Sequence, residues 1–96
     1  MEPSVIIFVI DGPIDRAGLP GLHDRFRLLL DGDVPDRIVC DVGALRPDAA
    51  AVDALARLQL TARRLGCEVW LSHASGELQE LLGLMGLQAA LPLSDP

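Results

Sequence analysis

The sequence contains no lysine, so all eight of its basic residues are arginine, and its fourteen acidic residues give a formal charge of −6. A net-acidic domain without a basic stripe has no electrostatic means of gathering a phosphate backbone. We therefore expect no nucleic acid among its partners.

The sequence also lacks a long hydrophobic run. The longest one, Val5 to Ile10, is far shorter than the roughly 20 residues that a helix needs to span a bilayer. No basic region precedes this run, and Asp11 follows it where a signal peptide needs small residues at its cleavage site. We expect no membrane insertion and a cytoplasmic location.

Cysteine and aromatic residues are few. Cys40 and Cys67 lie in apolar, strand-like segments, and no second Cys or nearby His completes a metal motif, so we expect two buried free thiols, no metal and no cofactor. Only three residues are aromatic, yet half of the 96 residues are hydrophobic, which is enough for one core but not for two. We expect a single domain over residues 1–96.

The pattern of hydrophobic residues predicts alternating strands and helices. Strands or extended segments are expected at 4–10, 37–42, 67–71 and 87–93. Helices are expected at 20–30, 51–65 and 75–85. This order predicts an α/β fold: a small, largely parallel or mixed sheet of about four strands with helices packed on it.

No group of residues forms a recognised catalytic motif. His73 follows the third predicted strand between Ser72 and Ser75, which is the best placed position for chemistry, but no acid or oxyanion motif accompanies it. Asp11 and Asp41 each end a strand, as in the phosphoacceptor site of a response regulator, but that site also uses a lysine, which this chain lacks. We expect no catalytic residue, and hence not an enzyme.

The segment 40–55 carries the most distinctive pattern. It reads CDVGALRPDAAAVDAL, in which a strand end is followed by a proline turn and the start of the longest predicted helix. This resembles the signature of STAS domains, the family of anti-sigma factor antagonists and of the cytoplasmic domains of sulfate transporters. Their pattern is Asp-Leu-Ser at a strand end, a short loop, and Asp-Ser-Ser-Gly-Leu at a helix start. If the loop is one residue shorter here, these places are taken by Asp-Val-Gly at 41–43 and Asp-Ala-Ala-Ala-Val at 48–52. Further family features are similar to the turn at 12–15 and the helix end at 82–87.

The resemblance implies a docking surface without its phosphorylation switch. In the regulatory members of the family, the partner anti-sigma factor is a kinase that phosphorylates the second serine of the helix-opening motif. That position is Ala50 here, so the usual phosphoacceptor is lost and the charge of about −1.5 to −2 that a phosphate adds cannot be placed there. The resemblance therefore implies constant binding of an anti-sigma factor or related regulatory protein. The residues that it implies at the contact are Arg46, Asp48, Ala49, Ala50, Val52 and Asp53.

Three other interpretations remain open. The chain could be a small-ligand sensor or carrier whose apolar and histidine-bearing loops bind a metabolite. It could be a scaffold or transporter-associated STAS subunit, alone or as a homodimer, and Leu60, which we expect to be exposed on the main helix, is a hint of such a contact. In the third interpretation the three alanines only raise helix propensity and contact no partner.

Overall fold

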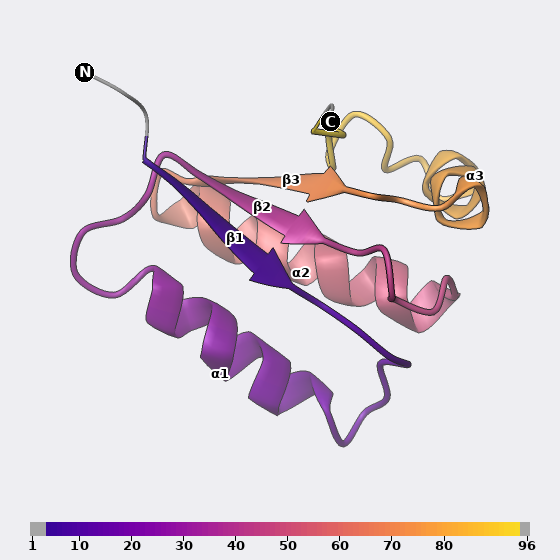
Figure 1. Ribbon diagram of the computed structural model, residues 1–96, viewed down its shortest axis with the longest axis horizontal. Coiled ribbons are helices and arrows are strands. Elements are labelled where there is room, and N and C mark those ends of the chain that lie inside the picture. The colour runs from indigo at the N-terminus through magenta and orange to yellow at the C-terminus, as the bar shows by residue number, and fades with distance from the viewer. Residues whose placement is uncertain (1–3, 95–96) are drawn as a thin grey trace.

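Three strands and three helices alternate along the chain in the computed structural model, which describes residues 4–94 (Figure 1). The strands are β1 (Val5–Val9), β2 (Arg37–Asp41) and β3 (Glu68–Ser72). The helices are α1 (Leu19–Leu29), α2 (Ala49–Arg64) and α3 (Gly76–Leu84). The strands lie in the order β1-β2-β3 and both pairings are parallel, which confirms the predicted α/β fold class.

The closing segment, residues 87–93, contributes less to the sheet than the full fourth strand expected from the sequence. Residues 88–90 form a turn, and Leu93 makes a single parallel bridge with Leu71. The Leu71 N–H donates to the carbonyl of Pro92 at 2.9 Å, and the Ser94 N–H donates to the carbonyl of Leu71 at 2.6 Å. Because Pro92 has no N–H of its own, the ladder does not extend along the edge of β3.

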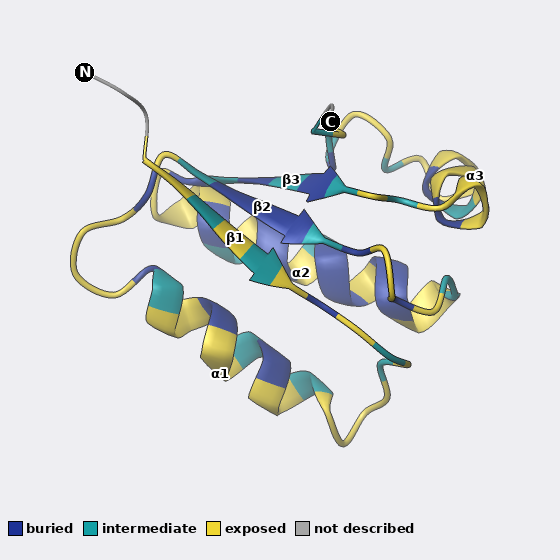
Figure 2. Ribbon diagram, viewed as in Figure 1, coloured by how far each residue is buried: buried dark blue, intermediate teal, exposed yellow. Residues whose placement is uncertain are grey.

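The helices α1 and α2 cover one face of the sheet. Side chains of successive strand residues point to opposite faces, and on the helix side Ile38 and Val69 are fully buried. Phe8 of β1 meets Phe26 of α1 edge to face, with 5.9 Å between the ring centroids. Figure 2 shows the buried residues concentrated in β2, β3 and α2, so the core lies between the sheet and α2.

The opposite face of the sheet has no helix over it in the described part of the chain (Figure 1). Its β1 side chains are exposed: Val5 by 47%, Ile7 by 70% and Val9 by 60%. Three β-branched hydrophobic side chains in a row are thus left in contact with solvent.

Short polar residues and a glycine fix the ends of the helices. The Asp48 carboxylate accepts a hydrogen bond from the Ala51 N–H at 2.8 Å and caps α2, and the Ser75 hydroxyl accepts one from the Leu78 N–H at 3.1 Å and caps α3. Gly66 follows α2 with a φ of +82°, which lets the chain turn directly into β3. The two caps and this glycine therefore fix where α2 begins, where α2 ends and where α3 begins.

A buried glutamine, Gln59, connects α2 to β3 through side-chain hydrogen bonds. The side-chain amide of Gln59 donates to the carbonyls of Val69 at 3.0 Å and Ala90 at 2.7 Å, and its oxygen accepts from the Val69 N–H at 2.7 Å. These Val69 groups would otherwise have no partner on the outer edge of β3, so the glutamine satisfies them as a neighbouring strand would.

Candidate functional site

The turn after β1 and the loop before α2 lie side by side. Gly12 forms an isolated parallel bridge with Leu45. Its N–H donates to the carbonyl of Ala44 at 3.0 Å, and its carbonyl accepts from the Arg46 N–H at 3.2 Å. Gly12 has a φ of +71°, a conformation that glycine adopts without strain, so the chain can turn at this point. The segments 12–15 and 41–52, which are distant in the sequence, therefore meet at one surface.

Most of the predicted contact residues lie at this surface. Ala49, Ala50 and Asp53 are exposed on the first turns of α2, and Arg46 is exposed in the preceding loop. Asp48 is half-buried at the helix cap. We call these five residues the docking surface, after the contact that the resemblance implies for them.

Val52 is the exception, and its prediction as a contact residue is wrong. Its side chain is 0% exposed and belongs to the hydrophobic core. A helix rotates by about 100° per residue, so Val52 points to the side of α2 nearly opposite that of Ala50. A partner on the docking surface cannot reach it.

A hollow with a volume of about 260 Å³ borders the docking surface at Ala50. Its lining comes from α2 and from the segment before α1: Ile14, Asp15, Arg16, Leu19, Ala50, Asp53 and Arg57. The Arg57 guanidinium donates to the Asp53 carboxylate at 2.9 Å. Two carboxylates and two guanidiniums line the hollow together with apolar side chains, so its charges balance. The hollow therefore suits a neutral or apolar side chain better than a strongly charged one.

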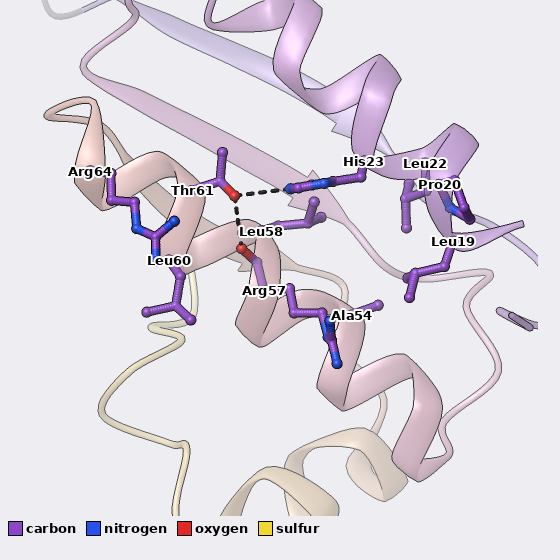
Figure 3. A pocket seen from close by; sticks show the side chains of 10 residues that line it. All are labelled: Leu19, Pro20, Leu22, His23, Ala54, Arg57, Leu58, Leu60, Thr61 and Arg64. Carbon is purple, nitrogen blue, oxygen red and sulfur yellow. Dashed lines mark hydrogen bonds between the residues drawn. The ribbon is translucent and has the colours of Figure 1, made fainter.

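A larger groove, with a volume of about 480 Å³, runs between α1 and α2 (Figure 3). It shares Leu19 and Arg57 with the hollow, so the two are adjacent. His23 Nε2 lies 2.9 Å from the hydroxyl of Thr61, which itself donates to the carbonyl of Arg57 at 3.2 Å. Leu60 lines the groove and is 58% exposed, which confirms the exposure expected from the sequence.

The polar side chains at the carboxyl ends of β2 and β3 make contacts within and between the loops that follow these strands. The Asp41 carboxylate accepts from the Gly43 N–H at 3.0 Å and lies 3.3 Å from Nδ1 of the exposed His73. A Cβ on Gly43 would lie only 3.1 Å from the Cβ of His73, so glycine allows these two loops to approach each other. Within residues 4–94 no three His, Cys, Asp or Glu side chains are grouped so that they could hold a metal ion.

Both cysteines are free and buried, as predicted. Burial raises the pKa of the Cys40 thiol to about 12, and burial also raises the pKa of Cys67. Because the thiolate is the reactive form, neither side chain is a nucleophile at neutral pH.

Sequence and structure comparisons connect this geometry to known proteins. Residues 2–93 match the family model described as "Mlab, STAS domain". A sulfate transporter family protein from Wolinella succinogenes is 28% identical with a TM-score of 0.69, and the likeness covers 91% of this chain and 70% of that one. The STAS domain of a SulP transporter from Vibrio cholerae is 15% identical with a TM-score of 0.72, and the likeness covers 91% of this chain and 67% of that one. At this low identity the second likeness concerns the fold alone. No curated protein matches the chain. None of the helices between residues 4 and 94 has the length and apolar character needed to cross a bilayer.

Proposed function

The chain belongs to the STAS domain family, and from this we propose that it is a protein-docking component of a membrane transport system that binds its partner through the docking surface. The observation that carries the proposal is its likeness, over 91% of its length, to the sulfate transporter family protein from Wolinella succinogenes. The proposal assigns the chain no catalytic reaction and a place on the cytoplasmic side of the membrane.

The side chains of the docking surface support contact with a protein rather than with a small polar molecule. Ala49 and Ala50 are exposed and small, so a partner can approach the backbone of α2 closely. A side chain that fills the hollow beside Ala50 would lose most of its contact with water, and one fully buried apolar side chain contributes about 1.5–3 kcal/mol. A few such anchors supply most of the affinity in many interfaces.

The groove between α1 and α2 extends the docking surface. It lies next to the hollow along α2, and Figure 3 shows Leu60 beside Arg64 at its far end, while the Arg57 side chain extends towards Ala54. Apolar side chains on an amphipathic helix or an extended segment of the partner would fit such a groove. We therefore include the groove in the proposed partner contact.

Docking on an anti-sigma factor or related regulatory protein is the second candidate. It is favoured by the pattern at 41–43 and 48–52, which lies at a strand end and a helix start, adjacent to the turn at 12–15. The same docking surface would be used, and the partner would not be released by phosphorylation at Ala50, since that residue has no hydroxyl. The identity of the captured partner distinguishes the two candidates.

The test is capture of partners from a lysate that contains solubilised membranes, followed by mass spectrometry. We expect the wild-type chain to retain a component of a transporter and Ala50→Arg to lose it, because the arginine fills the hollow. Ala89→Arg makes the same change at another exposed position and should retain the partner. A transporter component that binds Ala50→Arg as well as wild type would exclude the docking surface, and specific capture of an anti-sigma factor would favour the second candidate.

A further inference from the structure

The groove between α1 and α2 has the size and the lining of a small-molecule site (Figure 3). Its volume of about 480 Å³ lies within the roughly 300–1,000 Å³ that is typical of ligand pockets. Most of its lining is apolar and comes from both helices: Leu19, Pro20, Leu22, Ala54, Leu58 and Leu60. An apolar ligand would therefore contact apolar side chains on both sides.

A hydrogen bond between side chains joins the two walls of the groove. His23 on α1 points towards Thr61 on α2 (Figure 3), with 2.9 Å between Nε2 and the hydroxyl oxygen. The Thr61 hydroxyl donates to the carbonyl of Arg57, so its oxygen can accept a hydrogen bond from the Nε2–H of His23. This bond holds the two helices at a fixed spacing without a ligand, and a preformed site loses less entropy on binding.

The charged side chains of the groove are basic. Within the described part of the chain no aspartate or glutamate lines it, although the whole chain has a formal charge of −6. Arg57 is already paired with the Asp53 carboxylate at 2.9 Å. Arg64 forms no ion pair with any carboxylate of residues 4–94, and it lies beside Leu60 at one end of the groove (Figure 3). One unpaired guanidinium therefore adjoins an otherwise apolar groove.

We propose that the groove binds a monocarboxylate with a long apolar chain, whose carboxylate lies on Arg64 and whose chain lies between α1 and α2. A guanidinium donates two parallel hydrogen bonds to one carboxylate, so a single unpaired arginine suits a ligand with one negative charge. A dianionic phosphate would need a second free cation, which Arg57 does not supply because it is paired with Asp53. The ligand binds without the proposed protein partner, so this site does not depend on the docking proposal.

The dimensions of the groove set the length of the chain. Ala54 and Arg64 are ten residues apart on α2, which is roughly 15 Å along the helix axis. An extended chain advances about 1.2 Å for each bond, so roughly twelve carbons reach from one end to the other. With about 14 non-hydrogen atoms, each close to a water molecule in size, such a ligand takes up roughly 420 Å³, which the groove can hold. Length and volume thus agree.

Dodecanoate is the probe for this site, and ¹H–¹⁵N NMR of the whole chain measures its binding. We expect saturable shifts of the amide signals of His23, Thr61 and Arg64. The dissociation constant should be on the order of 10⁻⁴ to 10⁻³ M, as for other ligands of this number of atoms. Butanoate has the same head group and a short chain, and it should cause no saturable shift at the same concentrations. If dodecanoate left these signals unchanged, the proposal would be wrong and the groove would be left to the protein partner.

The sign of the head group separates this site from non-specific adsorption. A net charge of −6 attracts cations to the surface, so non-specific binding would favour dodecyltrimethylammonium over dodecanoate. The proposed site reverses this order, and the cation should bind at least about tenfold more weakly at His23 and Thr61. Equal or tighter binding of the cation at these signals would rule out a carboxylate site.

Arg64→Gln tests the position of the carboxylate. It should weaken dodecanoate binding by about fivefold to tenfold, since it removes a charge-assisted pair of hydrogen bonds. Arg63→Gln makes the same change of charge at an exposed position of α2 that does not line the groove, and should bind within about twofold of wild type. Leu60→Glu places a carboxylate in the groove and should abolish binding. If Arg64→Gln bound as tightly as wild type, or Arg63→Gln as weakly as Arg64→Gln, the carboxylate would not lie on Arg64.

Discussion

Ala50 and Val52 are two residues apart on α2, yet one lies on the docking surface and the other lies in the core. The difference follows from helix phase, since positions two apart point in nearly opposite directions. A sequence motif that is read as a continuous stretch therefore mixes residues that contact a partner with residues that hold the helix on the sheet. On α2, Ala50 shares the docking surface with its neighbour Ala49 and with Asp53 one turn later, while Ala51 and Val52 lie in the core.

The absence of lysine and tyrosine makes the alkaline titration of this protein simple. Between pH 9 and 12 the remaining ionisable side chains that change charge are the two cysteines, because arginine stays protonated. Burial raises the pKa of Cys40 from its ordinary value of 9.0 to about 12. Above pH 9 the unfolded chain loses this proton while the folded chain keeps it, so stability falls as the pH rises towards 12.

We therefore predict that the free energy of unfolding falls by roughly 1 kcal/mol for each pH unit as the pH rises from 9 towards 12, because the folded chain keeps the Cys40 proton. Urea denaturation at a series of pH values measures it. Cys40→Val keeps a small apolar side chain and removes the titrating group, so its curve should be flatter by about that slope. Equal slopes for the two proteins would mean that Cys40 does not hold its proton in the fold.

At the scale of elements, α2 depends on its first turn for both stability and docking. Asp48 caps the helix through the 2.8 Å bond from the Ala51 N–H and also carries a negative charge at the docking surface. We predict that Asp48→Ala lowers the free energy of unfolding by about 1 kcal/mol, which corresponds to a fall of about 4–8 °C in Tm for a domain of this size. Thermal denaturation followed by circular dichroism measures this effect.

Asp48→Asn separates the two roles of this residue. Asparagine caps a helix about as well as aspartate, so the stability of this variant should stay within a few tenths of a kcal/mol of wild type. Any change in partner capture by Asp48→Asn then reports on the charge alone. A loss of stability as large as that of Asp48→Ala would mean that the charge, and not the hydrogen bond, stabilises the start of α2.

The order and type of the elements could be predicted from the sequence because each is marked locally. Hydrophobic periodicity places the strands and helices to within one or two residues, and Asp48, Ser75 and Gly66 mark their ends. The closing segment and Gln59 were not predictable in the same way, because their contacts with β3 join residues that are distant in the sequence: Gln59 and Val69 are 10 positions apart, and Leu71 and Leu93 are 22 apart. One signal for the buried role of Gln59 was available. It lies four residues after Leu55, and therefore on the apolar side of α2.

The candidate site was predictable only in part for the same reason. The resemblance located the start of α2, and five of its six contact residues lie at the surface there. The groove between α1 and α2 and the uncovered face of the sheet depend on how distant elements pack, and no local pattern encodes them. Val5, Ile7 and Val9 alternate with the buried side of β1, but a fully covered strand has the same hydrophobic sequence.

At the scale of the whole molecule, the two proposed contacts lie on the same side of the fold. The docking surface is at the start of α2, and the groove runs along α2 with the helices that cover one face of the sheet (Figure 1). Leu19 and Arg57 belong both to the groove and to the hollow beside Ala50. A carboxylate ligand and a protein partner that extends into the groove would therefore compete, and each would lower the affinity for the other.

This overlap predicts that dodecanoate weakens the binding of the captured partner. At ten times its dissociation constant it should lower the affinity for the partner about tenfold, while in Arg64→Gln the same concentration should lower it only about twofold. Ile7→Lys changes a 70% exposed side chain on the uncovered face of the sheet and should behave as wild type. Biolayer interferometry with and without dodecanoate measures these differences. If dodecanoate bound the chain and left the affinity for the partner unchanged, the partner would not enter the groove, and the docking surface alone would carry the contact.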